Sequence, residues 1–140
     1  MKNLFYYLSM FTLLLTGTVV IIVSYWLLAP YTVVTFGGEN TKLVETTVKS
    51  GGYLHIKQDY CKHSPIPARV SCEFIDGLTY TVPVFNSDRE VGCAQRIEYK
   101  YIPKALPSGN FKMSCVYSYK VNPIRTVEYT LETDFFTIIK

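Results

Sequence analysis

The sequence contains few of the residues and motifs that mark an enzyme or a nucleic-acid-binding protein. It has two histidines and one tryptophan, and it lacks any G-x-S-x-G, P-loop, dinucleotide-binding or C-x-x-C motif. Its 14 basic and 11 acidic residues give a net charge of +3 and are interspersed along the chain. These absences argue against nucleotide-dependent catalysis, a redox dithiol and nucleic-acid binding. We therefore expect no enzyme activity, no small-molecule cofactor and no nucleic-acid partner.

Charge is also absent from one long stretch near the start of the chain. Leu4 to Ala29 form 26 consecutive uncharged, mostly apolar residues. A helix of that length reaches about 39 Å, more than the roughly 30 Å of a hydrocarbon core. Aromatic residues lie at both ends of this stretch, as they do at membrane interfaces, namely Phe5, Tyr6, Tyr7, Tyr25, Trp26 and Tyr31. Pro30 then ends the helix, because it has no N–H to donate.

This pattern predicts an uncleaved transmembrane anchor over residues 1–30, with the lipid bilayer as its partner. A cleaved signal peptide is the alternative, but it has a shorter apolar region and a small-residue cleavage site. Ala29 followed by Pro30 is a poor cleavage site. Lys2 and the amino terminus are positive, whereas charges after the stretch nearly cancel, which favours a cytoplasmic N-terminus. We expect a single-pass protein of the inner (cytoplasmic) membrane, with residues 31–140 periplasmic or extracellular.

Four cysteines lie in residues 31–140, and their even number is typical of disulfides in an oxidising compartment. Free buried thiols and a metal site are the alternatives. A zinc site usually takes its ligands in close pairs, which are missing here. We therefore expect two structural disulfides and no bound metal.

Residues 31–140 lack helical periodicity and read as an all-β domain. Runs of β-branched and aromatic residues are separated by turn residues, including those at 37–40, 50–52, 76–77, 103–110 and 121–123. The expected strands cover residues 31–36, 41–49, 53–59, 68–75, 78–85, 95–102, 110–121 and 126–139. This pattern predicts an immunoglobulin-like β-sandwich of about seven or eight antiparallel strands behind the transmembrane helix. The core tryptophan and the tyrosine corner of true immunoglobulin domains are missing.

Alternation within two expected strands indicates how the cysteines pair. Cys115 shares a face with the apolar positions of strand 110–121, and Cys72 shares one with those of strand 68–75. Both cysteines should therefore point into the core and could bridge facing sheets. Cys61 and Cys93 fall in expected loops. We favour the pairs Cys72–Cys115 and Cys61–Cys93 over the two other connectivities.

The two histidines give little support to catalysis or metal binding. His55 shares a strand face with polar neighbours and should face solvent. Cys61 and His63 together could offer a thiolate and an imidazole to copper or zinc, but a blue-copper site needs a second histidine. Nucleophilic catalysis needs a base held by a third group, and the sequence shows no such set.

Loops remain as the candidate functional surface. The segment from Cys61 to Pro67 is basic and rich in proline, and Arg125 follows a proline turn. Because sandwich domains bind partners through end loops or strand edges, Lys62, His63 and Arg125 are the candidate partner-binding residues. This predicts a non-enzymatic, membrane-anchored binding or structural module with an envelope protein as partner. The alternatives are a phage lysis or superinfection-exclusion protein acting through its helix, and a small envelope hydrolase or metalloprotein.

Two short segments also carry a resemblance to a class of proteins. Leu106 to Met113 and Tyr119 to Thr126, with Tyr60-Cys61-Lys62 and Val91-Gly92-Cys93, resemble small membrane-anchored proteins of tailed phages and prophages, over about residues 50–138. The resemblance implies a phage or bacterial origin and a β-rich periplasmic domain. It implies no catalytic residues. The absence of an N-x-[ST] glycosylation site agrees with this origin.

Overall fold

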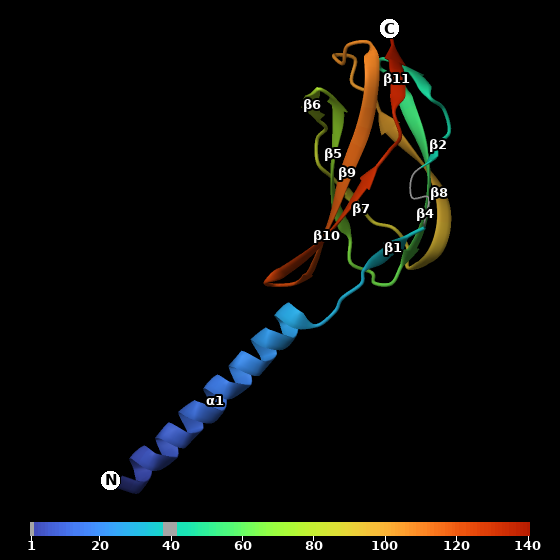
Figure 1. Cartoon of the computed structure of the whole chain (residues 1–140). Coiled ribbons are helices and arrows are strands. Elements are labelled where there is room, and N and C mark those ends of the chain that lie inside the picture. The colour runs from blue at the N-terminus through green and yellow to red at the C-terminus, as the bar shows by residue number, and fades with distance from the viewer. Residues whose placement is uncertain (1, 38–41) are drawn as a thin grey trace.

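One long helix is followed by strands only. The computed structural model describes residues 2–37 and 42–140, and α1 covers Lys2–Leu28 (Figure 1). The strands are β1 (Val34–Phe36), β2 (Lys42–Leu43), β3 (Thr47–Lys49), β4 (Tyr53–Lys62), β5 (Ala68–Asp76), β6 (Leu78–Thr81), β7 (Phe85–Ser87), β8 (Gly92–Tyr101), β9 (Gly109–Asn122), β10 (Arg125–Glu132) and β11 (Phe136–Ile139). Residues 38–40 of the expected turn, and residue 41 at the start of an expected strand, lie outside the described residues.

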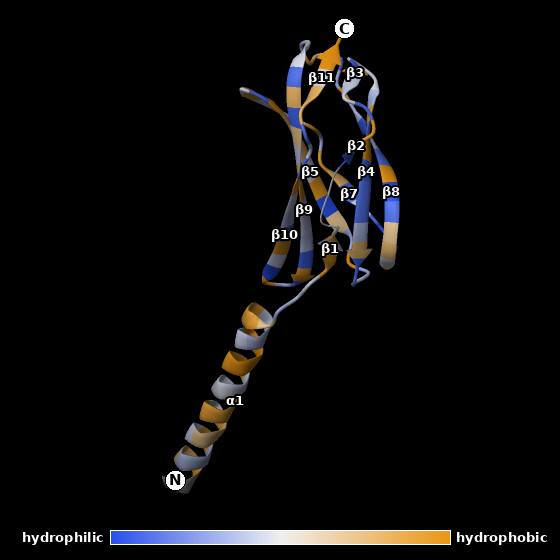
Figure 2. Cartoon of the chain, turned by 45° about the vertical axis from the view of Figure 1, so that its right-hand side comes forward, coloured by the Kyte–Doolittle hydropathy of each residue, from blue (hydrophilic) through white to orange (hydrophobic). Residues whose placement is uncertain are grey.

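The helix α1 has the length and composition of a membrane span, as predicted. Its segment Leu4–Leu28 is the one described helix that is apolar enough to cross a bilayer, and Figure 2 shows apolar residues along it. The hydroxyls of Thr12, Thr16 and Thr18 donate to carbonyls four residues earlier, at 2.8–2.9 Å. These three hydroxyls thus find hydrogen-bond partners within the helix. The helix ends at Leu28, just before Pro30 removes a donor.

The strands form two sheets. In the smaller sheet β4 pairs antiparallel with β1, β2 and β8. The larger sheet runs β3-β11-β9-β5-β6, with β10 also on β9 and β7 also on β5. All of its described pairings are antiparallel except β3 with β11. The all-β expectation and the two-sheet arrangement are therefore confirmed.

The core lies between the two sheets. Along β9 the side chains at Phe111, Met113, Cys115, Tyr117 and Tyr119 are buried and their neighbours are not, as the period-two pattern predicts. β5, its neighbour in the same sheet, and β4, in the facing sheet, bury alternate side chains in the same way. The ring of Phe36 on β1 packs against that of Tyr117, with centroids 5.7 Å apart, and so joins the sheets. This burial is the main term that holds the strands together.

Both disulfides favoured by the sequence are present, but neither bridges the two sheets. Cys72 on β5 lies directly opposite Cys115 on β9, and the two strands are hydrogen-bonded neighbours. Both cysteines point into the core because they lie on the same face of one sheet. The expected bridge between facing sheets is therefore wrong. Cys61 and Cys93 lie opposite each other on β4 and β8, so their expected loop positions are also wrong.

The structure has eleven described strands because three of the expected strands are interrupted. The expected strand 41–49 becomes β2 and β3, 78–85 becomes β6 and β7, and 126–139 becomes β10 and β11. The expected Asp76-Gly77 hairpin joins β5 and β6. Its last strand pair is Asp76 with Leu78, so Gly77 alone forms the tip, at φ +64°. A residue with a side chain would be strained there.

Candidate functional site: a groove beside strand β8

Among the described strands, β8 is the longest that pairs with only one neighbour. All ten of its residues pair with β4, and within the described residues no other strand pairs with it. Its second backbone edge is therefore unpaired. Such an edge is a template for another extended segment, and natural proteins usually cover it.

Two adjoining hollows run beside β8, between it and β7. The wider one, about 530 Å³, is lined by Phe85, Asn86, Ser87 and Asp88 and by Arg96, Ile97, Glu98, Tyr99 and Lys100. The second, about 260 Å³, is lined by Cys72, Phe74, Val82, Phe85, Tyr99, Lys100, Tyr101 and Met113. Because Phe85, Tyr99 and Lys100 line both, we treat the hollows as one site and call it the β8 groove.

The β8 groove has a polar part and an apolar part. Asp88, Arg96 and Glu98 supply charge to the wider hollow. Phe74, Val82 and Met113, which lie near the buried Cys72–Cys115 disulfide, supply an apolar lining to the other. The Nζ of Lys100 lies 4.4 Å from the centroid of the Phe85 ring, where the two parts meet. An apolar lining with a few polar groups is typical of a binding site.

Tyrosines cover the outer face of the same ladder. Tyr53 and Tyr101 are cross-strand partners whose ring centroids are 5.6 Å apart, and His55 and Tyr99 are partners at 4.8 Å. Tyr99 is 65% exposed and Tyr53 is 56% exposed. Exposed tyrosines provide large contact areas at low entropic cost, as in antibody binding sites. The Nδ1 of His55 also lies 2.8 Å from the carboxylate of Glu45.

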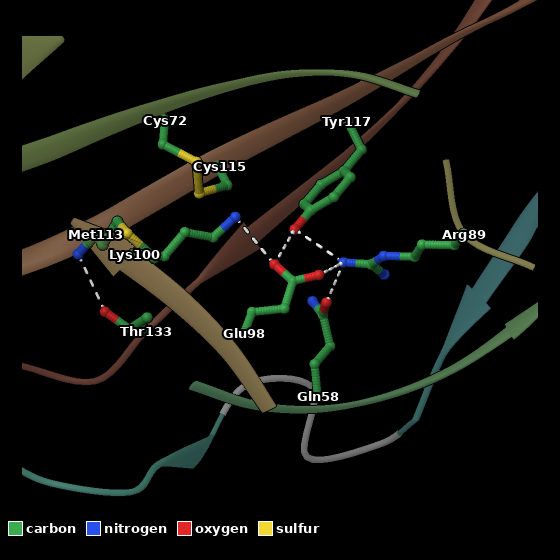
Figure 3. The surroundings of a disulfide bond; sticks show 9 residues. All are labelled: Gln58, Cys72, Arg89, Glu98, Lys100, Met113, Cys115, Tyr117 and Thr133. Carbon is green, nitrogen blue, oxygen red and sulfur yellow. Dashed lines mark hydrogen bonds and ion pairs between the residues drawn. A yellow bond between two sulfur atoms is a disulfide. The ribbon is translucent and has the colours of Figure 1, made fainter. Parts of the chain in front are cut away.

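A buried arginine holds β8 from the inside (Figure 3). Arg89 lies in the β7–β8 loop, and its side chain crosses the core between the sheets. Its Nη2 donates to Gln58 on β4 and to Glu98 on β8, and to the Tyr117 hydroxyl on β9 at 3.1 Å. The guanidinium carbon is 4.7 Å from the ring centroid of Tyr60 and 4.9 Å from that of Tyr117. One side chain thus ties three strands and a loop together.

The carboxylate of Glu98 is the acidic partner of both Arg89 and Lys100. Burial raises the pKa of Glu98, but the charges of Lys100 and Arg89 and hydrogen bonds from both outweigh it. The pKa of Glu98 therefore lies below its ordinary value, and the carboxylate stays ionised. Burial, together with the Glu98 carboxylate, raises the pKa of Tyr117, so its hydroxyl stays protonated. Two members of this network, Glu98 and Lys100, line the β8 groove.

The three residues that the sequence put forward for partner binding are not assembled into this site. Lys62 is buried at the end of β4, and its Nζ donates to the Arg89 carbonyl at 2.5 Å, so its expected position on an exposed loop is wrong. The alternating burial of β4 continues for three residues beyond the expected strand 53–59, and this places Lys62 on the inward face. His63 is exposed, with its Nε2 3.1 Å from the Thr35 hydroxyl. Arg125 lies beside the end of α1, where its Nη1 donates to the Ala29 carbonyl.

Sequence reasoning missed the β8 groove, although part of its signal was present. Tyr99 and Tyr101 are two residues apart on the expected strand 95–102, and Tyr53 and His55 are two residues apart on 53–59. This spacing gives each strand one aromatic face. Arg89 gave no such signal, because it sits in a charged segment that resembles a solvated loop. Its burial depends on Tyr60, Tyr117 and other residues distant in sequence.

The metal-binding alternative finds no support in the described part of the chain. No group of three or more His, Cys, Asp or Glu residues there is arranged to hold a metal ion. Cys61 is bonded to Cys93, so the thiolate considered beside His63 does not exist. The comparisons give no further guide to chemistry: no protein-family model matches the chain, and no curated protein matches it.

Proposed function

We propose that the chain is a membrane-anchored, extracytoplasmic binding module that holds an extended segment of a partner protein along β8. The observation that carries this proposal is the unpaired edge of the ten-residue strand β8, bordered by a groove with an apolar part. An added strand would gain backbone hydrogen bonds from β8. Its alternate side chains would enter the groove and contact the tyrosines on the outer face. In this proposal the chain is not an enzyme.

The finer expectations about place and architecture belong to the same proposal. Two disulfides support an oxidising compartment, and α1 supports a single-pass anchor. We take the N-terminus as cytoplasmic and the β domain as periplasmic or extracellular, in the envelope of a bacterial or phage-infected cell. An immunoglobulin-like sandwich is supported by two packed, mostly antiparallel sheets. Both disulfides lie within sheets, whereas antibody domains have one between them.

A display experiment with the full chain in lipid nanodiscs tests the binding proposal. The probe is a library of random short peptides, selected first on the wild type. We expect selected peptides to alternate apolar and polar residues, and to lose affinity when alternate backbone nitrogens are methylated. Tyr99→Ala and Phe85→Ala should each weaken binding. Leu78→Ala is the matched control, because Leu78 is 67% exposed and does not line the groove. Peptides that bind all three variants and tolerate N-methylation contradict the proposal.

A second candidate function places the activity in the helix itself, as in lysis or exclusion proteins. A shallow hollow on α1 favours it, lined by Ser9, Thr12, Leu13, Thr16, Gly17, Val20 and Ile21. Small residues on one helix face allow close approach of another helix. Expressing residues 1–33 alone separates the candidates, since growth inhibition by the helix without the β domain would favour the second.

A further inference from the structure

The end of α1 and one turn of the β domain lie side by side, and this fixes the turn relative to a bilayer. Tyr25 and Trp26 are in the last turns of α1, and both side chains are exposed, by 69% and 39%. Aromatic rings at the end of a membrane span prefer the headgroup level. If Leu4–Leu28 spans the bilayer, as the proposed function holds, Trp26 lies in the interfacial layer.

Two hydrogen bonds attach the β9–β10 turn to this level. The side-chain amide of Asn122, at the end of β9, donates to the Trp26 carbonyl at 3.0 Å. The Nη1 of Arg125, at the start of β10, donates to the Ala29 carbonyl at 2.5 Å. Both figures of the whole chain place this turn beside the end of α1 (Figures 1 and 2). The two bonds also satisfy carbonyls that a helix end leaves without a partner. The positive charge of Arg125 is favourable there, because the C-terminal end of a helix is partially negative.

The turn itself has an apolar tip with a basic rim. Ile124 is 52% exposed, although it is a large apolar residue, and Pro123 beside it is exposed as well. The Asn122 side-chain oxygen accepts a hydrogen bond from the Ile124 backbone N–H at 3.1 Å, which fixes the tip. Lys120 and Arg125 flank it, and no acidic residue occurs between positions 112 and 127.

We propose that the β9–β10 turn, residues 120–125, docks on the lipid headgroup layer, with Ile124 inserted into the interface and Lys120 and Arg125 facing phosphate oxygens. An apolar tip with a basic rim is the composition of interfacial membrane anchors. Basic side chains near a membrane surface are attracted to its negatively charged phosphate groups. The β domain then has two attachments to one leaflet, the linker from α1 and this turn. Two attachments restrict its rotation about the helix axis.

Tryptophan fluorescence in vesicles tests this docking, because Trp26 is the one tryptophan of the chain. The wild type, Trp26→Phe/Ile124→Trp and Trp26→Phe/Leu78→Trp are reconstituted as full chains in phosphatidylcholine vesicles, with or without bromine near the top of the acyl chains. Leu78 follows the far end of β5, away from α1, and is the matched control. Intact disulfides on a non-reducing gel show that each variant is folded.

We expect Trp26 and the tryptophan at position 124 to lose fluorescence to a similar extent in brominated vesicles, with blue-shifted emission. The tryptophan at position 78 should stay unquenched. Quenching of Trp26 without quenching at position 124 overturns the docking and leaves the anchor intact. Blue-shifted but unquenched emission at position 124 also overturns it, because protein rather than lipid then covers the turn. An unquenched Trp26 overturns the anchor and the docking together.

Discussion

Arg89 and Glu98 form an ion pair inside the β domain, between the β7–β8 loop and the inner side of β8. The side chain of Arg89 is 2% exposed and that of Glu98 is 15% exposed. A loop that would otherwise be free at the mouth of the groove is therefore attached to the strand that forms its edge. The position of β8 depends on this pair as well as on its pairing with β4.

Arg89→Met should strongly destabilise the protein. Removing one partner of a buried ion pair typically costs about 3–5 kcal/mol, because the other charge stays buried. Lys100, 2.9 Å from the Glu98 carboxylate, compensates in part, so we expect a loss near 3 kcal/mol, the low end of that range. Urea unfolding followed by near-ultraviolet circular dichroism measures the loss. Arg96→Met, on the exposed part of β8, is the control and should change little. Equal effects of the two variants would contradict the structural role of Arg89.

Glu98 should make folding dependent on pH on the acid side. Its pKa is lower in the folded protein than in the unfolded chain. Its contribution to stability is therefore fully present above the unfolded pKa, which is about 4.3. That contribution is lost as the pH falls through the folded pKa. The difference in unfolding free energy between wild type and Glu98→Gln should shrink as the pH is lowered below 4.3. A difference that stays constant from neutral to acid pH would show that the ionised carboxylate does not stabilise the fold.

The two disulfides should differ in their sensitivity to reductants. Both sulfur-bearing residues of the Cys72–Cys115 pair are 2% exposed, whereas Cys93 of the other pair is exposed. Under a mild, water-soluble phosphine, Cys61 and Cys93 should become alkylated first, as peptide mapping by mass spectrometry would detect. Equal rates for the two pairs would mean that the protein opens globally before either bond is reduced.

Removing the buried Cys72–Cys115 disulfide should destabilise the protein more than removing the Cys61–Cys93 disulfide. Cys72→Ala/Cys115→Ala opens a link between residues 43 positions apart. The chain-entropy model assigns such a link about 4 kcal/mol. Thermal unfolding of the double variant measures the loss. Cys61→Ala/Cys93→Ala, with a sequence separation of 32, is a matched control of nearly equal loop entropy. A larger loss for the buried pair would therefore report its packing in the core.

The direction of insertion is tested with reporters fused after Lys140. A reporter active only outside the cytoplasm should be active there, and a cytoplasmic reporter should be silent, since both disulfides need an oxidising compartment. A reporter placed before Lys2 should give the opposite result. The reverse pattern at Lys140 would place the β domain in the cytoplasm.

Local pattern was sufficient to predict α1 and β9, because α1 is one long uncharged run and β9 follows a clear period of two. The alternation from Phe111 to Val121 predicts the buried face of β9, and the uncharged run before Pro30 predicts α1. The same alternation could not show which strands are neighbours. It placed Cys72 and Cys115 on inward faces, but inward residues of one sheet and of facing sheets look alike in sequence.

The candidate site was harder to predict, because it depends on which strand lies at an edge and which charge lies inside. Most of β8 is exposed, and its partly buried residues Glu98 and Lys100 are charged, so its sequence resembles a solvated strand rather than a site. Arg89 and Lys62 are both buried: Arg89 lies against the rings of Tyr60 and Tyr117, and Lys62 donates to the Arg89 carbonyl. Composition treats both as surface residues. Strand pairing and core packing bury these two residues, and both depend on contacts between residues far apart in the chain.

The order of the disulfides along the chain affects how the protein matures. The pairs Cys61–Cys93 and Cys72–Cys115 interlock, since one cysteine of each lies between those of the other. If the chain is translocated from the anchored end, as the proposed topology requires, Cys61 and Cys72 reach the oxidising side first, yet they are not partners. Oxidation in order of emergence would join them. Exchange of that bond for the native pairs proceeds by thiolate attack and takes seconds to hours, depending on the oxidant and on isomerase. Production of the native protein should therefore depend on a disulfide isomerase as well as an oxidase.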